Sequence, residues 1–102
     1  KQKTVCLTNW RIKVLDDNSA ICVEGKEKHT KDVFRCSDAV TERIARNKLK
    51  TLSGCIYLLQ GKINTASMRN GGFPYYFTKN FAYGFPRKWK KYVKGFLEEK
   101  KR

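Results

Sequence analysis

The sequence is poor in the side chains that most enzyme chemistry requires. Its 102 residues include a single histidine, His29, and only nine carboxylates, and no two of these groups form a plausible acid and base pair. General acid and base catalysis needs such groups within hydrogen-bond reach of the reacting atoms. A glycine-rich phosphate loop is also missing, because Gly71 and Gly72 are followed by Phe-Pro and not by a Lys-Ser pair. We therefore predict a protein that is not an enzyme and has no small-molecule substrate.

Paired cysteines are absent too. Cys6, Cys22, Cys36 and Cys55 stand singly with wide gaps, and the sequence has neither a Cys-x-x-Cys motif nor a Cys/His pair. Structural zinc sites need such closely spaced ligands, so we predict no metal site and no cofactor. Free thiols fit a reducing nuclear or cytosolic compartment better than a secreted one.

Long apolar runs are lacking as well. The sequence has no stretch of about 18 apolar residues, the length that a membrane-spanning helix needs, and it does not start with an apolar leader. We expect neither a signal peptide nor a membrane contact. Hydrophobic residues make up 40% of the chain and include six Phe, five Tyr and two Trp, which is enough for one packed domain spanning residues 1–102.

Acidic residues are outnumbered by basic ones. Lys and Arg total 23 against 9 Asp and Glu, which gives a formal net charge of +14. A field of this size attracts polyanions and acidic protein surfaces. The charge therefore favours anionic partners and says nothing about the fold.

The first third of the sequence predicts strands. Apolar residues alternate over residues 5–15 and change phase near Thr8 and Asn9, which indicates one strand with a bend. Residues 16–19 are typical of a turn, and residues 20–24 form the return strand of a hairpin. We expect a short third strand at residues 33–36.

The middle of the chain predicts one helix and a second hairpin. Val40 and Ile44 have helical spacing after a capping residue, which favours a short helix within residues 37–47. Residues 48–52 and 55–63 then form a hairpin whose return strand is apolar on both faces, so that strand should lie centrally and be covered on both sides. Residues 64–72 are expected to be a polar loop.

The tripeptide Gly-Phe-Pro occurs twice near the C-terminus, at residues 72–74 and 84–86. Each copy joins a residue that tolerates a left-handed backbone to an apolar anchor and to a proline suited to the start of a helix. Each should therefore precede a helix, and the predicted helices carry apolar residues at helical spacing. These residues are Phe73, Phe77 and Phe81 in the first helix and Phe85, Trp89, Val93, Phe96 and Leu97 in the second.

Together these patterns predict an α+β fold. We expect a curved or barrel-like antiparallel sheet of about five strands, with a short middle helix and two C-terminal helices packed on it.

The last helix also predicts a basic surface, which is the candidate binding site. It consists of Arg87, Lys88, Lys90, Lys91 and Lys94. Cations neutralise phosphates and exposed aromatic rings stack on bases, so this face together with Tyr75, Tyr76, Tyr83 and Tyr92 would suit a nucleic acid. The same face would suit an acidic protein, and the edge of the sheet at residues 33–36 could accept an added strand. Two further alternatives are that the lysines form a solvated helix face without a ligand and that the tyrosines form the rim of the core. Composition does not choose between these alternatives.

Four segments in order resemble the SANTA (SANT-associated) domain. They are LTNWRI at residues 7–12, ICVEG at 21–25, GCIYLLQG at 54–61, and the two Gly-Phe-Pro tripeptides followed by Trp89. The resemblance spans nearly the whole chain. The signature residues are Trp10, Gly61, Phe73, Pro74, Phe85, Pro86 and Trp89, and we interpret them as apolar anchors and turns.

The resemblance implies a non-enzymatic interaction module excised from a longer chromatin protein. Such a protein would act in the nucleus, at the centromere of the chromosome, and would support recruitment of the machinery that deposits the histone H3 variant CENP-A. Its implied partners are other centromere or chromatin proteins. The alternative is direct binding to DNA or nucleosomal DNA through the basic C-terminal helix.

Overall fold

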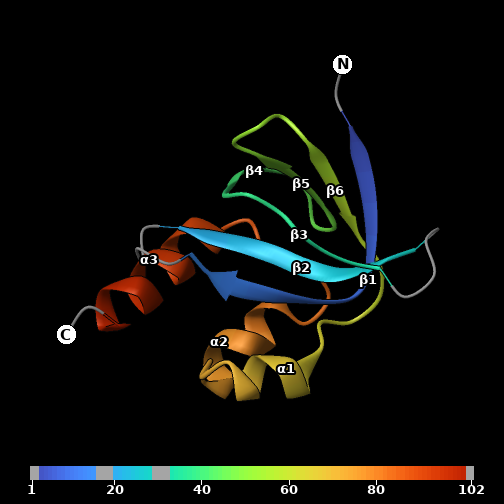
Figure 1. The fold of residues 1–102 in the computed structure, drawn as a ribbon. Helices are drawn as coiled ribbons and strands as arrows, with labels where there is room; N and C mark the ends of the chain where they lie inside the picture. Colours follow the sequence, from blue (N-terminus) through green and yellow to red (C-terminus); the bar gives the residue numbers. More distant parts are fainter. Residues whose placement is uncertain (1–2, 16–19, 29–32, 101–102) are drawn as a thin grey trace.

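The computed structural model describes residues 3–15, 20–28 and 33–100 and confirms the α+β class (Figure 1). The turn predicted at residues 16–19 and the histidine His29 lie outside the described residues. In chain order the elements are β1 (Thr4–Val14), β2 (Ile21–Glu27), β3 (Phe34–Cys36), β4 (Val40–Ala45), β5 (Lys48–Thr51), β6 (Ile56–Leu59), α1 (Thr65–Asn70), α2 (Tyr75–Thr78), the 3-10 helix η1 (Lys79–Phe81) and α3 (Trp89–Lys100).

The described strands form one open sheet of six strands in the order β3-β2-β1-β6-β5-β4. The predicted sheet of about five strands is confirmed, with β4 as an additional strand, but it is mixed and not purely antiparallel, because the β1–β6 pair is parallel. The parallel pair joins two antiparallel units, β1-β2-β3 and β4-β5-β6. Pairing between strands so far apart in the sequence leaves no local turn signal, so the apolar pattern alone did not indicate its direction.

The bend predicted in β1 is confirmed and makes the sheet curve. Asn9 has a positive φ of 49°, and the register with β2 shifts between Thr8 and Arg11. Asparagine is one of the few residues with a side chain that tolerate this left-handed conformation. An irregularity of this kind bends a strand and increases its twist. β1 pairs with β6 only before the bend, whereas its pairing with β2 starts at Leu7 and continues past the bend (Figure 1).

The helix predicted within residues 37–47 is wrong, because this segment forms the edge strand β4. Val40 and Ile44 are four residues apart, a spacing that fits one face of a helix and also one face of a regular strand. In β4 the register with β5 shifts twice, so Val40 is buried while Ile44 is 44% exposed. The pairing with β5 therefore prevails over the apparent helical period.

The polar loop predicted at residues 64–72 contains a helix. In α1, the side-chain oxygen of Asn64 accepts a hydrogen bond of 3.1 Å from the backbone N–H of Ser67 and caps the first turn. Met68 is the buried apolar residue of α1, and its sulfur accepts a hydrogen bond of 3.3 Å from the backbone N–H of Ile12. One apolar residue gives no periodicity, which is why the pattern missed a helix whose cap is plain in the sequence.

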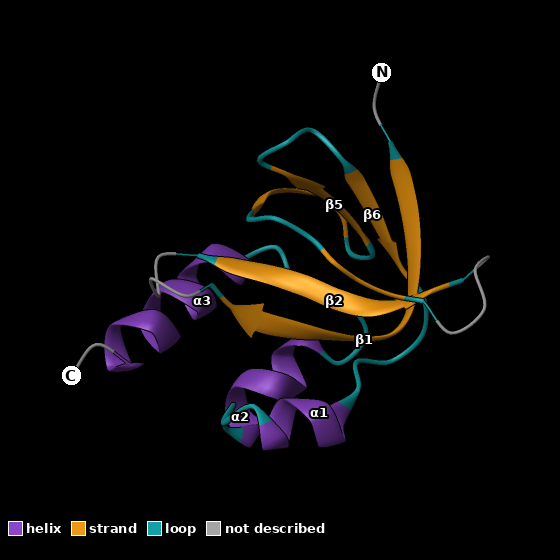
Figure 2. Ribbon diagram, in the orientation of Figure 1, coloured by secondary structure: helices purple, strands orange, loops and turns teal. Residues whose placement is uncertain are grey.

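The two predicted C-terminal helices are confirmed, the first as α2 continued by η1 and the second as α3. Figure 2 shows α1 and α2 against the side of the sheet formed by β1 and β2, with α3 near the ends of those strands. One cluster of buried side chains joins the helices to the sheet. Within the described part of the chain, no helix has the length and apolar character needed to cross a membrane.

Candidate functional site

The aromatic signature residues lie in one continuous series of ring contacts beneath the helices. Phe85 lies between the two tryptophans, with ring centroids 6.4 Å from Trp10 and 5.4 Å from Trp89. Phe85 also meets Phe81 edge to face at 5.0 Å. The contacts continue from Phe81 through Phe77 to Phe73. Edge-to-face and offset ring pairs stabilise a core beyond the area that they bury, so these residues hold the helices on the sheet.

Trp10 links this series of rings to the loop that follows β6. Its side chain is fully buried, and its indole N–H donates a hydrogen bond of 3.0 Å to the carbonyl of Gly61. Gly61 has φ of 76°, and a Cβ placed there would contact nothing, so the backbone conformation is what favours glycine. The Trp10 carbonyl in turn accepts a 2.8 Å hydrogen bond from the N–H of Asn64, the cap of α1. Both signature residues thus fix the path of the chain from β6 into α1.

The second Gly-Phe-Pro binds the turn before α3 to the end of β4. The Phe85 N–H donates to the carbonyl of Arg46 at 2.7 Å, and the Phe85 carbonyl accepts from the Nε of Arg43 at 2.7 Å. Gly84 has φ of 131°, and a Cβ there would overlap the backbone of Arg46. The Pro86 carbonyl accepts a 3.1 Å hydrogen bond from the Trp89 N–H at the first residue of α3. Sequence patterns did not indicate the roles of Arg43 and Arg46, because arginines in a strongly basic chain are expected to be charged surface residues.

The first Gly-Phe-Pro starts α2. Pro74 is the N-cap residue, and its carbonyl accepts hydrogen bonds from the N–H groups of Phe77 at 3.1 Å and Thr78 at 3.2 Å. Phe73 is buried and stacks on Phe96 of α3 at 4.7 Å. This copy therefore packs α2 against α3.

The five candidate cations lie on and just before the first half of α3, and we call them the basic helix face. All five are exposed: Arg87, Lys88, Lys90, Lys91 and Lys94. The opposite side of α3 carries the buried residues Trp89, Val93 and Phe96. The core therefore fixes the direction of the basic helix face, whose five side chains are exposed, and the ammonium group of Lys90 lies over the Trp89 ring, 5.8 Å from its centroid.

The charges in the first turn of α3 oppose the helix dipole. This turn carries Lys90 and Lys91 and no acidic residue. Cations at a helix N-terminus are unfavourable, because the dipole is positive at that end. Among the described residues, no ion pair neutralises any of the five cations. The start of α3 is therefore a concentrated positive surface that lowers helix stability.

The candidate tyrosines differ in their exposure. Tyr75 and Tyr83 are 79% and 66% exposed, and Tyr76 is 55% exposed. The Tyr76 hydroxyl donates a 2.8 Å hydrogen bond to Glu99, and this bond raises the pKa of Tyr76 above its ordinary value. Tyr92 instead lies partly buried, edge to face with Phe81 at 6.3 Å. Three of the four tyrosines predicted as candidates for base stacking are thus on the surface.

The cysteines are free in the structure. Cys22 is buried and Cys36 is exposed, and their sulfurs lie 3.5 Å apart on β2 and β3. Burial and the hydrogen bond with Cys36 raise the pKa of Cys22 to about 12, so its thiol is protonated at neutral pH. In the described ranges, His, Cys, Asp and Glu nowhere gather in a group of three that could hold a metal ion.

The predicted sheet edge at β3 is present. β3 is the outermost strand on one side of the sheet, and Phe34 is 68% exposed there. Because β3 has three residues, its edge is a smaller candidate surface than the basic helix face.

The comparison with protein families gives one match. The family model described as SANTA (SANT Associated) matches residues 5–92, which covers the strands, α1, α2 and the first turn of α3. The match includes Arg87, Lys88, Lys90 and Lys91 of the basic helix face and ends before Lys94. No solved structure matches the chain.

Proposed function

Because the chain belongs to the SANTA (SANT Associated) family, we propose that it is a non-enzymatic interaction module of a centromere protein. In this proposal the module docks on another centromere or chromatin protein. It thereby supports recruitment of the machinery that deposits the histone H3 variant CENP-A. The parent protein would be of the vertebrate Mis-eighteen-binding type and would act in the nucleus, at the centromere.

The observation that carries the proposal is the unneutralised charge of the basic helix face. A helix start that carries Lys88, Lys90 and Lys91 without a neighbouring acid is less stable than one with the opposite charges. Such an arrangement is useful when an acidic surface supplies the missing countercharge. Complementary charge also raises the rate of encounter with a large anionic target such as chromatin.

The signature residues support a division of roles. Trp10, Phe85 and Trp89 are buried in ring contacts. A partner cannot reach them without unfolding the domain, so recognition falls to the exposed residues around them. The basic helix face is adjacent to Phe85 and Trp89 in the sequence, and the exposed Tyr83 also lies close to Phe85.

The test reverses two charges of the basic helix face in the full-length protein and follows its recruitment to centromeres in dividing cells. Lys88→Glu combined with Lys91→Glu should abolish recruitment while the melting temperature of the domain stays unchanged or rises. The matched control is Lys62→Glu combined with Lys79→Glu, because both lysines are exposed and the change in net charge is equal. Normal recruitment of the first variant, or equal loss in both, would refute the role of the basic helix face.

Direct binding to DNA is the second candidate, and the exposed rings of Tyr75 and Tyr83, together with the basic helix face, favour it. In this case the purified chain should bind duplex DNA of unrelated sequences with a steep salt dependence. The Lys88→Glu and Lys91→Glu pair should make the plot of log affinity against log salt concentration less steep, by the equivalent of about two phosphate contacts. Absence of binding at low salt would reject this candidate and leave the protein partner.

A further inference from the structure

Strand β6 is apolar on both faces, but the structure packs only one of them into the core. Tyr57 and Leu59 point to the inner face and belong to the buried cluster that holds the helices. Ile56 and Leu58 point the other way, and neither is part of that cluster. The central position predicted for β6 is confirmed, whereas the second covering layer predicted with it is not found among the described residues. A two-sided apolar strand normally has a cover on each side.

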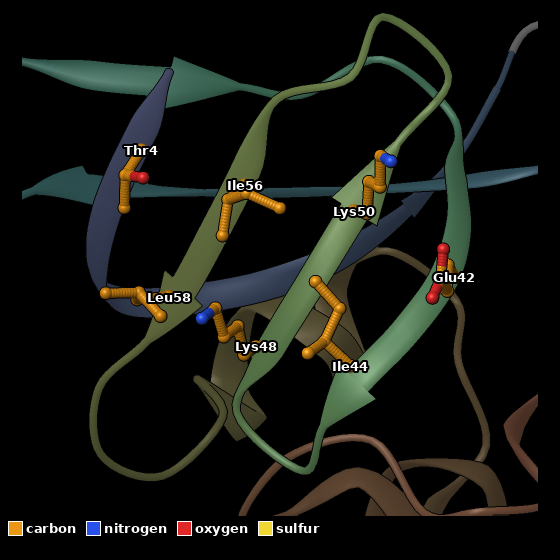
Figure 3. A pocket seen from close by; sticks show the side chains of 7 residues that line it. All are labelled: Thr4, Glu42, Ile44, Lys48, Lys50, Ile56 and Leu58. Atoms are coloured by element: carbon orange, nitrogen blue, oxygen red, sulfur yellow. The ribbon is translucent and has the colours of Figure 1, made fainter. Parts of the chain in front are cut away.

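This second face is a shallow hollow, which we call the outer face. Figure 3 shows side chains from β1, β6, β5 and β4 on the same side of the sheet. The hollow has a volume of about 420 Å³, and strand residues alone line it. The lining residues are Thr4, Glu42, Ile44, Lys48, Lys50, Ile56 and Leu58.

The outer face alternates apolar and basic rows. Ile56 and Leu58 form a row on β6, and the next row on β5 consists of Lys50, paired with Ile56, and Lys48, paired with Leu58. Long lysine side chains can cover apolar neighbours with their methylene groups while the ammonium groups stay in water. Ile56 is only 4% exposed although it lies outside the core cluster. We therefore expect the neighbouring lysines to cover Ile56 in part, and a partner that packs there must displace them.

The irregular pairing of β4 extends this floor to the edge of the sheet. A register shift between Arg43 and Ala45 leaves Ile44 without a direct partner on β5. The Ile44 side chain lines the hollow and is 44% exposed. Irregularities of this kind often re-aim a side chain next to a functional site. Here the shift gives the outer face an exposed apolar side chain on β4, across the lysine row of β5 from Ile56 and Leu58.

The charges of the outer face identify the kind of occupant. In the described part of the chain, neither Lys48 nor Lys50 forms an ion pair, although Glu42 is the register partner of Lys50. The hollow holds two ammonium groups against the one carboxylate of Glu42, and this excess of positive charge beside apolar side chains suits a ligand with carboxylates next to apolar side chains. A second copy of this chain would bring two lysine-containing faces and two charges of +14 together. Self-association is therefore disfavoured.

We propose that the outer face docks a short acidic segment of a partner protein. Apolar side chains of that segment pack on Ile44, Ile56 and Leu58, and its carboxylates pair with Lys48 and Lys50. The outer face shares no residue with the basic helix face, so this second docking surface does not depend on the function proposed above. It would let one SANTA module hold two acidic partners, or two parts of one partner, at the same time.

The test is an NMR titration of the whole chain with a synthetic peptide of alternating Asp and Leu. The expected result is a change in the amide signals of residues 44, 48, 50, 56 and 58. An alternating Lys and Leu peptide and an alternating Asp and Ser peptide serve as controls, and neither should cause those changes. Equal changes with the Asp and Ser peptide would overturn the apolar part of the proposal, and changes confined to α3 would overturn the site.

Paired variants separate this site from the basic helix face. Lys48→Glu combined with Lys50→Glu should weaken the Asp and Leu peptide at least about tenfold, which corresponds to about 1.4 kcal/mol. Lys88→Glu combined with Lys91→Glu should leave the affinity within about twofold. Lys48→Ala with Lys50→Ala provides a second pair that keeps the sheet free of new charge and should also weaken binding. Unchanged affinity for the peptide in the double Glu variant or in the double Ala variant of Lys48 and Lys50 would refute the proposal. Loss of the same amide signals through self-association in the absence of peptide would also refute it.

Discussion

Two halves of the sheet differ in how their faces are covered. The half that contains β2 and the second part of β1 lies against the helices, and its buried residues include Trp10, Ile12 and Val23 (Figure 2). The half that contains β4, β5 and β6 shares the inner core but leaves its outer face to lysine side chains. The difference teaches that a strand's apolar pattern reports how much cover the strand needs, while the cover itself can come from the same chain or from another molecule.

The substitution with the largest expected effect on stability is Trp89→Ala. Trp89 is 6% exposed and packs on Phe85, so its loss should lower the free energy of unfolding by roughly 3 to 5 kcal/mol. The matched change in the other half is Ile44→Ala, where the side chain is already 44% exposed and the expected loss is below about 1 kcal/mol. Urea unfolding followed by circular dichroism measures both. Equal losses would show that the two halves do not differ in this way.

A smaller effect is expected at the junction between the halves. Gly84→Ala forces a side chain into a backbone with φ of 131° and against the backbone of Arg46. Backbone strain alone costs about 1 to 3 kcal/mol. Gly95→Ala is the control, because a Cβ at this position in α3 meets open space and alanine favours the helix by about 1 kcal/mol. The two variants should therefore move the unfolding midpoint in opposite directions, and a shift in the same direction would contradict the geometry.

The smallest effect concerns a polar contact that stabilises the half with the open face. The carboxylate of Asp38 accepts hydrogen bonds from the backbone N–H and the hydroxyl of Ser53, at 2.6 Å and 3.1 Å. Partial burial opposes ionisation, but hydrogen bonds from Thr51 and Ser53 outweigh it and lower the pKa of Asp38. Its stabilising contribution is therefore present above the ordinary pKa of Asp, about 3.9, and is lost as the pH falls through the lower folded value.

Asp38→Asn tests this contribution. Unfolding free energy measured against pH should fall less steeply on acidification in the variant than in the parent chain. The aromatic contacts of the other half carry no charge and should add no pH dependence of their own. Identical pH profiles for the two chains would contradict the assignment to Asp38.

Much of the half that lies against the helices could be predicted from the sequence. The bend at Asn9, the first hairpin and the two C-terminal helices leave strong local signals, since each combines an apolar period with a turn or cap residue. The basic helix face was also predicted, because the spacing of apolar residues in α3 fixes which side remains for the lysines.

The rest depends on contacts that no local pattern carries. The spacing of Val40 and Ile44 fits a helix and a strand equally, and the pairing of β4 with β5 decides between them. Arg43 and Arg46 were missed because their partner, Phe85, lies about forty residues further along the chain. The outer face was not predicted because Ile44 reaches it only through the pairing of β4 with β5, a segment predicted as a helix, and Thr4 only through the parallel pair.

That parallel pair has a consequence for how the domain is made. Thr4 pairs with Ile56 and Leu7 with Leu59, so β1 meets its second neighbour only after β2, β3, β4 and β5 have been synthesised. Closing so long a loop costs more conformational entropy than closing a local hairpin does, which makes this step slow. A nascent chain therefore holds an unpaired strand edge until β6 leaves the ribosome. During that interval the chain is most exposed to strand exchange with its neighbours and most dependent on chaperones.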